Sequence, residues 1–107
     1  MEIFDLMNLQ AQGYQNRKVN VLYQNDVFKT RVIVLEAKGK IPECQMDTHV
    51  MFYVVEGEVI LHKNNEASVL KENQLFISEP ALLSMESVTG ARLMGVQIKS
   101  SLKEDNV

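Results

Sequence analysis

Short extended segments separated by turn residues dominate the chain from Val19 onward. The segment 27–35, VFKTRVIVL, is rich in β-branched residues, as strands are. Pairs such as Asn64-Asn65, which tolerate positive φ, mark tight turns between such segments. About eight short strands with turns roughly every 8–12 residues predict an all-β sandwich or barrel, with its core over about 19–98.

The first residues follow another pattern, with apolar side chains spaced as on two turns of a helix. These are Ile3, Phe4, Leu6, Met7 and Leu9. We therefore expect a short N-terminal helical segment that ends before Gly13. Because two turns are too few for a stable isolated helix, this segment must dock on the β-structure.

The size and charge of the chain set limits on its class. A length of 107 residues fits one domain, 1–107, and the polar end 100–107 is expected to be a frayed tail. Eleven basic and fourteen acidic residues give a net charge of −3, which argues against nucleic acid and anionic membranes as partners.

Location follows from similar observations. No apolar run approaches the ~18 residues of a membrane span, and the first residues lack the basic start of a signal peptide. A single cysteine, Cys44, excludes an internal disulfide and fits a reducing compartment. We expect a cytoplasmic protein.

The run 50–55, VMFYVV, is apolar on both faces of a strand. Alternation places Val50, Phe52 and Val54 on one face, and the other face holds Met51, Tyr53 and Val55. Because the outward face of an antiparallel strand is normally polar, something must cover these three side chains. We favour a homodimer interface formed by Met51, Tyr53 and Val55, and cover by the N-terminal segment is the alternative.

Two stretches resemble the motifs of the cupin superfamily. The segments 39–44 (GKIPEC) and 52–58 (FYVVEGE) resemble the first cupin motif, and 73–81 (NQLFISEPA) resembles the second. The resemblance implies a double-stranded β-helix, the RmlC-like jelly-roll barrel, commonly dimeric and with an interior pocket.

The metal-binding positions of the motifs are replaced. Where cupins carry two histidines, a glutamate and a third histidine, this chain matches Cys44, Met46, Val50 and Ser84. Cupin metals take imidazole nitrogens and a carboxylate oxygen, whereas Val50 has no donor atom and Ser84 is a poor ligand. We therefore expect no cofactor, and these residues argue against the usual metal-dependent cupin enzyme.

The favoured interpretation is a metal-independent barrel that binds a small molecule or has a structural or regulatory role. Its pocket would be lined by Cys44, Met46, Val50 and Ser84, with Phe52, Met85 and Met94 close by. No Ser-His-Asp order, phosphate-binding glycine loop or Cys-x-x-Cys is present, so we name no catalytic residue and favour a non-enzyme.

The alternative is an atypical metal site. Cys44 and Met46 point to the same side of an extended segment, and His49 follows closely. Such soft donors suit copper, or zinc with less preference for methionine, in a metalloprotein or enzyme. The competing explanation is that Cys44 and Met46 are core fillers, as both residue types often are.

Overall fold

A computed structural model describes residues 1–99, so the predicted tail lies outside the described residues. It contains one short 3₁₀ helix followed by eight strands. In chain order these are η1 (Tyr14–Asn20), β1 (Val21–Gln24), β2 (Phe28–Leu35), β3 (Lys40–Met46), β4 (His49–Lys63), β5 (Glu66–Lys71), β6 (Leu75–Ser78), β7 (Ala81–Glu86) and β8 (Ala91–Ile98).

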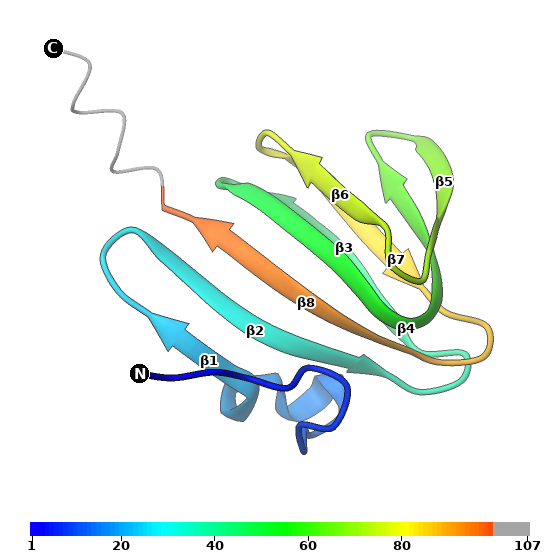
Figure 1. The fold of residues 1–107 in the computed structure, drawn as a ribbon. Coiled ribbons are helices and arrows are strands. Elements are labelled where there is room, and N and C mark those ends of the chain that lie inside the picture. The colour runs from blue at the N-terminus through cyan, green and yellow to red at the C-terminus, as the bar shows by residue number, and fades with distance from the viewer. Residues whose placement is uncertain (100–107) are drawn as a thin grey trace, which may run out of the picture.

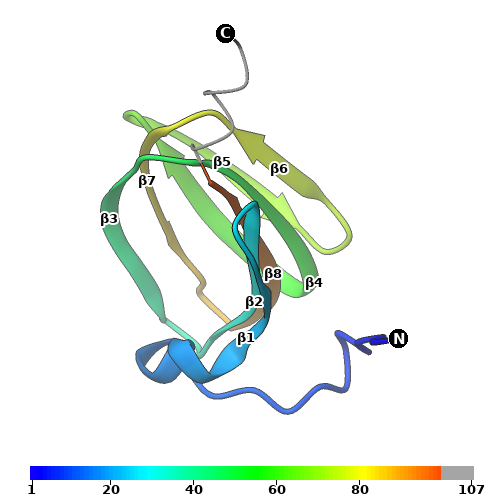
Figure 2. The same ribbon diagram turned by 90° about the vertical axis from the view of Figure 1, so that its left-hand side faces the viewer.

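The strands form two antiparallel layers that share β4. The first layer runs β1-β2-β8-β4-β6 and uses the first part of β4. The second runs β3-β7-β4-β5 and uses the last part of β4, from Glu58 to Lys63. The sheet curls so that β3 and β7 lie opposite β2 and β8 across the interior (Figure 2). The predicted all-β jelly-roll barrel is confirmed.

Gly57 lies where β4 passes from one layer to the other. It has φ of +83°, in the left-handed region that favours glycine. A Cβ atom at this position would stand 2.4 Å from the carbonyl oxygen of Gly90, which is backbone and cannot turn away. The strand register also shifts just before it, between Val54 and Glu56. The backbone conformation and the lack of space for a Cβ atom therefore require a glycine at this position of the segment 52–58.

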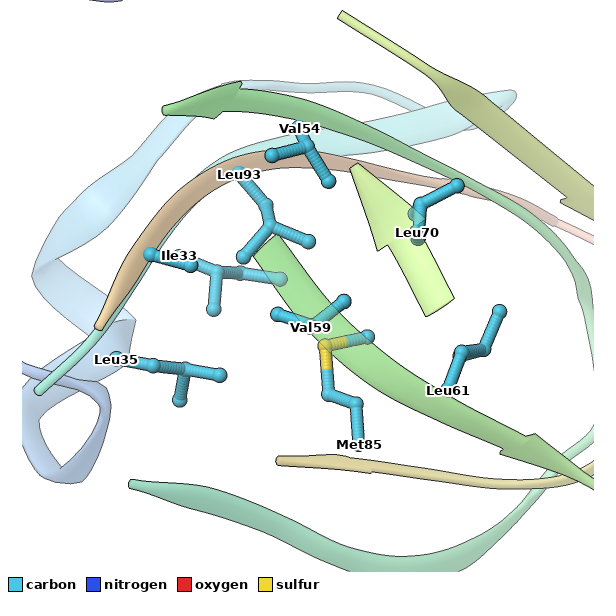
Figure 3. Packing of buried hydrophobic residues seen from close by; sticks show 9 residues of the cluster. Ile33, Leu35, Val54, Val59, Leu61, Leu70, Met85 and Leu93 are labelled. Atoms are coloured by element: carbon cyan, nitrogen blue, oxygen red, sulfur yellow. The ribbon is translucent and has the colours of Figure 1, made fainter. Parts of the chain in front are cut away.

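A packed core fills one end of the interior (Figure 3). Leu93 of β8 has no exposed surface and lies among side chains from both layers. Its neighbours in the cluster are Ile33, Leu35, Val54, Val59, Leu61, Leu70, Met85 and Ala91. A smaller cluster of Val50, Ala81 and Leu83 adjoins it through the partly buried Phe52 and Phe76.

Two strands extend beyond the segments singled out in the sequence. The apolar run 50–55 is the first part of one long strand, β4, which continues to Lys63 because Gly57 allows the backbone to bend without ending the strand. The segment around Pro42 is strand β3. It tolerates the proline at a register shift between Ile41 and Cys44, where a ladder hydrogen bond is not needed.

The helical segment exists, but its predicted position is wrong. Residues before Gly13 form only a turn, and the helix is η1, after that glycine. The side chain of Arg92 explains the difference, because its Nη1 donates to the carbonyl oxygens of Leu6 (3.3 Å) and Leu9 (2.7 Å). These carbonyls bind a strand side chain, and apolar residues such as Ile3 remain 84% exposed.

The outer face of the first layer is apolar, and its most exposed part lies on β6. Register places Met51 beside Ile77 and Tyr53 beside Leu75, and Ile77 and Leu75 are 61% and 53% exposed. Val55 lies at the register shift of β4 and is half-buried. The N-terminal segment meets this face at β8, where the outward side chain of Arg92 binds the carbonyl oxygens of Leu6 and Leu9, whereas β6 lies at the far edge of the layer from β1 (Figure 1).

Among residues 1–99, no helix has the length and apolar character that crossing a membrane requires.

Candidate functional site

A cavity of about 200 Å³ lies between the two layers, beyond the packed end of the interior. It is bordered by η1 and by strands β2, β3, β4, β7 and β8. Its apolar lining includes Ile33, Ile41, Met46, Phe52, Leu83 and Met85. Phe52 also stacks on Phe76, with ring centroids 6.2 Å apart and an interplanar angle of 8°. The interior is thus packed at one end and open at the other.

Cys44 and Met46 both line this cavity. Cys44 pairs with the buried Leu83, and Met46 pairs with the buried Ala81, so both side chains are on the inward face of β3. Val50 is also inward, but it is fully buried in the smaller core cluster and does not border the cavity.

Two predicted pocket residues have side chains on outer faces. Ser84 borders the cavity, but it pairs with His62 and alternates with the inward Leu83 and Met85, so its hydroxyl lies on the outer face of the second layer. Met94 pairs with Tyr53 and therefore belongs to the outer face of the first layer. Of the residues expected nearby, Phe52 and Met85 do line the cavity.

The residues at the matched cupin positions do not fit a cupin metal. Only Cys44 and Met46 present donors to the cavity, and both are sulfur atoms. His49, the third residue of the alternative site, precedes the inward Val50, is exposed and does not line the cavity. Within residues 1–99, no three His, Cys, Asp or Glu side chains form a group that could hold a metal ion.

A group of cations lines the cavity that the sequence analysis did not identify. Arg17 of η1 and Lys29 and Arg31 of β2 border it, and no acidic residue does. We call these three residues the basic cluster. The signal was present in the segment 27–35, because the alternation that points Ile33 inward also points Lys29 and Arg31 inward. The overall negative charge of the chain concealed this local excess of cations.

The basic cluster is held without neutralising partners. The guanidinium of Arg17 lies 4.4 Å from the centroid of the Tyr14 ring and donates to the Tyr14 carbonyl oxygen at 3.3 Å. Within the part of the chain that the structure describes, Lys29 and Arg31 side chains make no hydrogen bond, and no member of the cluster forms an ion pair. The two ion pairs found there, His62–Glu86 and Lys63–Glu79, involve none of its members.

This arrangement disfavours the charged forms of the two strand residues. Burial lowers the pKa of Arg31, and the nearby Arg17 lowers it further, against an opposing effect of Tyr14. Burial likewise lowers the pKa of Lys29, with added repulsion from Arg31 and Lys99. Because burial and repulsion disfavour the charged forms of Lys29 and Arg31, an anion bound in the cavity would stabilise both charges.

The imidazole of His62 and the carboxylate of Glu86 meet outside the cavity. His62 Nε2 is 3.3 Å from Glu86 Oε1, and both side chains are about 40% exposed. The pairing of β4 with β7 brings these two residues together across 24 positions of the chain. They lie on the outer face of the second layer with Ser84 and take no part in the cavity.

Comparison with known proteins identifies the fold of this chain. No protein-family profile and no curated protein sequence matches the chain. Among solved structures, an RmlC-like cupin from Desulfovibrio desulfuricans is 14% identical, with a TM-score of 0.77 over 92% of this chain and 96% of that chain.

Two further structures agree. An RmlC-like cupin from Shewanella frigidimarina is 22% identical, with a TM-score of 0.70 over 81% of this chain and 78% of that chain. The cupin domain of Schizosaccharomyces pombe Cnp3 is 18% identical, with a TM-score of 0.71 over 80% of this chain and 66% of that chain. Identities this low establish the fold alone, and by its fold this chain is a cupin barrel.

Proposed function

We propose that this protein is a small-molecule-binding cupin that works without a metal ion. The observation that carries the proposal is the 200 Å³ cavity, which is mostly apolar and has a few polar groups on one side. Binding sites for small molecules generally have this composition. A volume of about 200 Å³ fits a compact ligand.

Binding of a compact probe tests this proposal. Benzyl alcohol should shift the backbone amide resonances of cavity-lining residues such as Phe52 and Met85 in two-dimensional NMR. The variant Cys44→Phe puts a ring into the cavity from β3 and should abolish these shifts. Ala67→Phe, at an exposed position of β5, is the matched control and should leave them unchanged. Shifts that persist in Cys44→Phe would place the probe elsewhere and refute the proposal.

Metal independence rests on the donor set at the matched positions. Two sulfur atoms, of Cys44 and Met46, make an incomplete site, and His49 does not reach the cavity. Elemental analysis of protein purified without added metal should find neither copper nor zinc at stoichiometric levels. Stoichiometric metal that disappears in Cys44→Ser would instead establish the alternative, a metalloprotein. The single cysteine also supports a cytoplasmic location as part of this proposal.

We also propose that a second copy covers the outer face of the first layer. Its exposed apolar side chains include Ile77 and Leu75 next to the predicted interface residues Met51 and Tyr53. Contiguous apolar faces of this kind mark interfaces. Light scattering at two concentrations should give the mass of a dimer, and Ile77→Lys should give a monomer, whereas Val69→Lys on β5 should not. A wild-type monomer at both concentrations would overturn this proposal.

A further inference from the structure

The basic cluster defines what kind of molecule the cavity accepts, and this inference rests on the proposed binding function. Lys29 and Arg31 reach the cavity from β2, and Arg17 reaches it from η1. Two separate elements therefore bring three cations to one small volume. In a chain with a net charge of −3, a cavity that three cations and no acid border is a local reversal of sign.

The cluster retains unused capacity for an anion. A guanidinium carries five N–H donors, and only Nη1 of Arg17 has a protein acceptor, the Tyr14 carbonyl. Stacking on the Tyr14 ring fixes that guanidinium while leaving its other donors free. No side-chain nitrogen of the cluster is both buried from solvent and unbonded, so these donors can be reached from the cavity or its opening.

The rest of the cavity lining is mostly apolar and includes an aromatic ring. Phe52 and Met85 contribute to it, and Ile33 follows Arg31 on the same face of β2. Gly95 lies across from Arg31 and has no side chain, so the ring of Phe52 and the end of Ile33 approach the space that a Cβ would take, at 3.3 and 3.1 Å. A charged surface and an apolar surface thus face the same compact volume.

We propose that the cavity binds a compact organic anion, a carboxylate or phosphate carried on an apolar or aromatic body. The anionic group lies among Arg17, Lys29 and Arg31, and the body lies against Phe52, Met85 and Ile33. Guanidinium groups bind carboxylate and phosphate alike, often through two parallel hydrogen bonds, so the two share one recognition chemistry here. The apolar side favours an organic anion over an inorganic one, because an inorganic anion would leave Phe52 and its neighbours without contact.

Calorimetric titration with four probes tests this inference. Benzoate and phenyl phosphate carry an anion on an aromatic ring, benzyl alcohol has the ring alone, and inorganic phosphate has the anion alone. We expect either or both ring-bearing anions to bind at least tenfold more tightly than benzyl alcohol and inorganic phosphate. The preference between benzoate and phenyl phosphate then identifies the anionic group. Binding of the anions should weaken as salt is added.

Variants assign the effect to residues. Arg31→Met keeps an unbranched apolar stem and removes the charge, so it should weaken binding of the preferred anion at least tenfold and leave benzyl alcohol within twofold. Lys71→Met removes a cation from the exposed surface of β5 and should change neither affinity. Circular dichroism checks that Arg31→Met is folded, and Lys29→Met offers a second removal of charge from the same side.

The outcomes separate the two proposals. If benzyl alcohol binds as tightly as the anions, the cavity is a binding site and the anion inference is wrong. If inorganic phosphate binds as tightly as phenyl phosphate, the apolar side has no role and the inference is again wrong. If no probe binds at the cavity, the proposed function itself fails, and the anion inference fails with it.

Discussion

The inward side of β2 changes character halfway along the strand. Ile33 and Leu35 are buried in the packed cluster around Leu93, whereas Lys29 and Arg31, on the same face, line an open cavity. The first pair stabilises the fold through burial and close contact. The second pair loses stability through burial and repulsion of charge. β2 therefore stabilises the barrel core at one end and lines the candidate binding site at the other.

Truncation at the packed end should give the largest effect. Leu93→Ala removes a side chain with no exposed surface from the packed cluster, which closes such a space only in part (Figure 3). We expect a loss of about 3 kcal/mol in the free energy of unfolding, measured by urea denaturation. Met46→Ala at the half-buried wall of the cavity should cost less than half as much. Equal losses would show that the two ends do not differ in packing.

An added methyl group at the boundary between the two ends should have an intermediate effect. In Gly95→Ala, the new Cβ would lie 3.1 Å from Ile33 Cδ1 and 3.3 Å from Phe52 Cε1. Ile33 is packed in the core cluster, so we expect the partly buried Phe52 to shift instead. We expect a loss of about 1 kcal/mol in stability, by urea denaturation, and weaker binding of benzyl alcohol. Unchanged affinity would show that Phe52 does not form a wall of the binding site.

The same strand shows how far sequence reasoning extends. The β-branched segment 27–35, together with the turn residues, predicted the barrel, and in the structure alternation along β2 places Ile33 inward. The same alternation points Lys29 and Arg31 inward, but charged residues are rarely buried unless they are paired. The sequence alone therefore argued against an inward position, and the strand register was needed to show that both residues line a cavity.

Other features depended on partners that are distant in sequence. The N-terminal carbonyls bind Arg92, more than 80 positions away, so a helical pattern over residues 3–9 did not become a helix. The match of Ser84 to a ligand histidine counted positions along a motif, but a shift of one position in a strand moves a side chain to the other face. Local sequence patterns thus predicted the strands, whereas the pairing register between strands determines which side chains line the cavity.

Removal of one cation should stabilise the open end. Arg31→Met keeps contact with the apolar lining and removes a charge whose pKa burial lowers. Because solvent still reaches the guanidinium and screens its interactions, the gain in unfolding free energy should be small, about 0.5 kcal/mol, or a rise in Tm of roughly 2–4 °C. Differential scanning calorimetry at pH 7 measures it. A loss of stability would show that the cation has a structural partner and is not held for a ligand.

The smallest effect should be a dependence on pH at Lys29. Burial and the neighbouring Arg31 and Lys99 lower its pKa below the ordinary value of 10.5, so the unfolded chain binds the proton more tightly than the folded one. Protonated Lys29 therefore reduces stability at every pH below its lowered pKa, and the penalty disappears as pH rises through that value to above 10.5. Lys29→Met should be more stable than the wild type at pH 7, by a few tenths of a kcal/mol because most of the ammonium is hydrated, and this difference should vanish above pH 10.5. Urea denaturation of both proteins at the two pH values checks the sign. If the stability difference between Lys29→Met and the wild type stays constant with pH, it comes from packing of the methionine. Charge repulsion within the basic cluster would then not contribute measurably to the contrast between the two ends of β2.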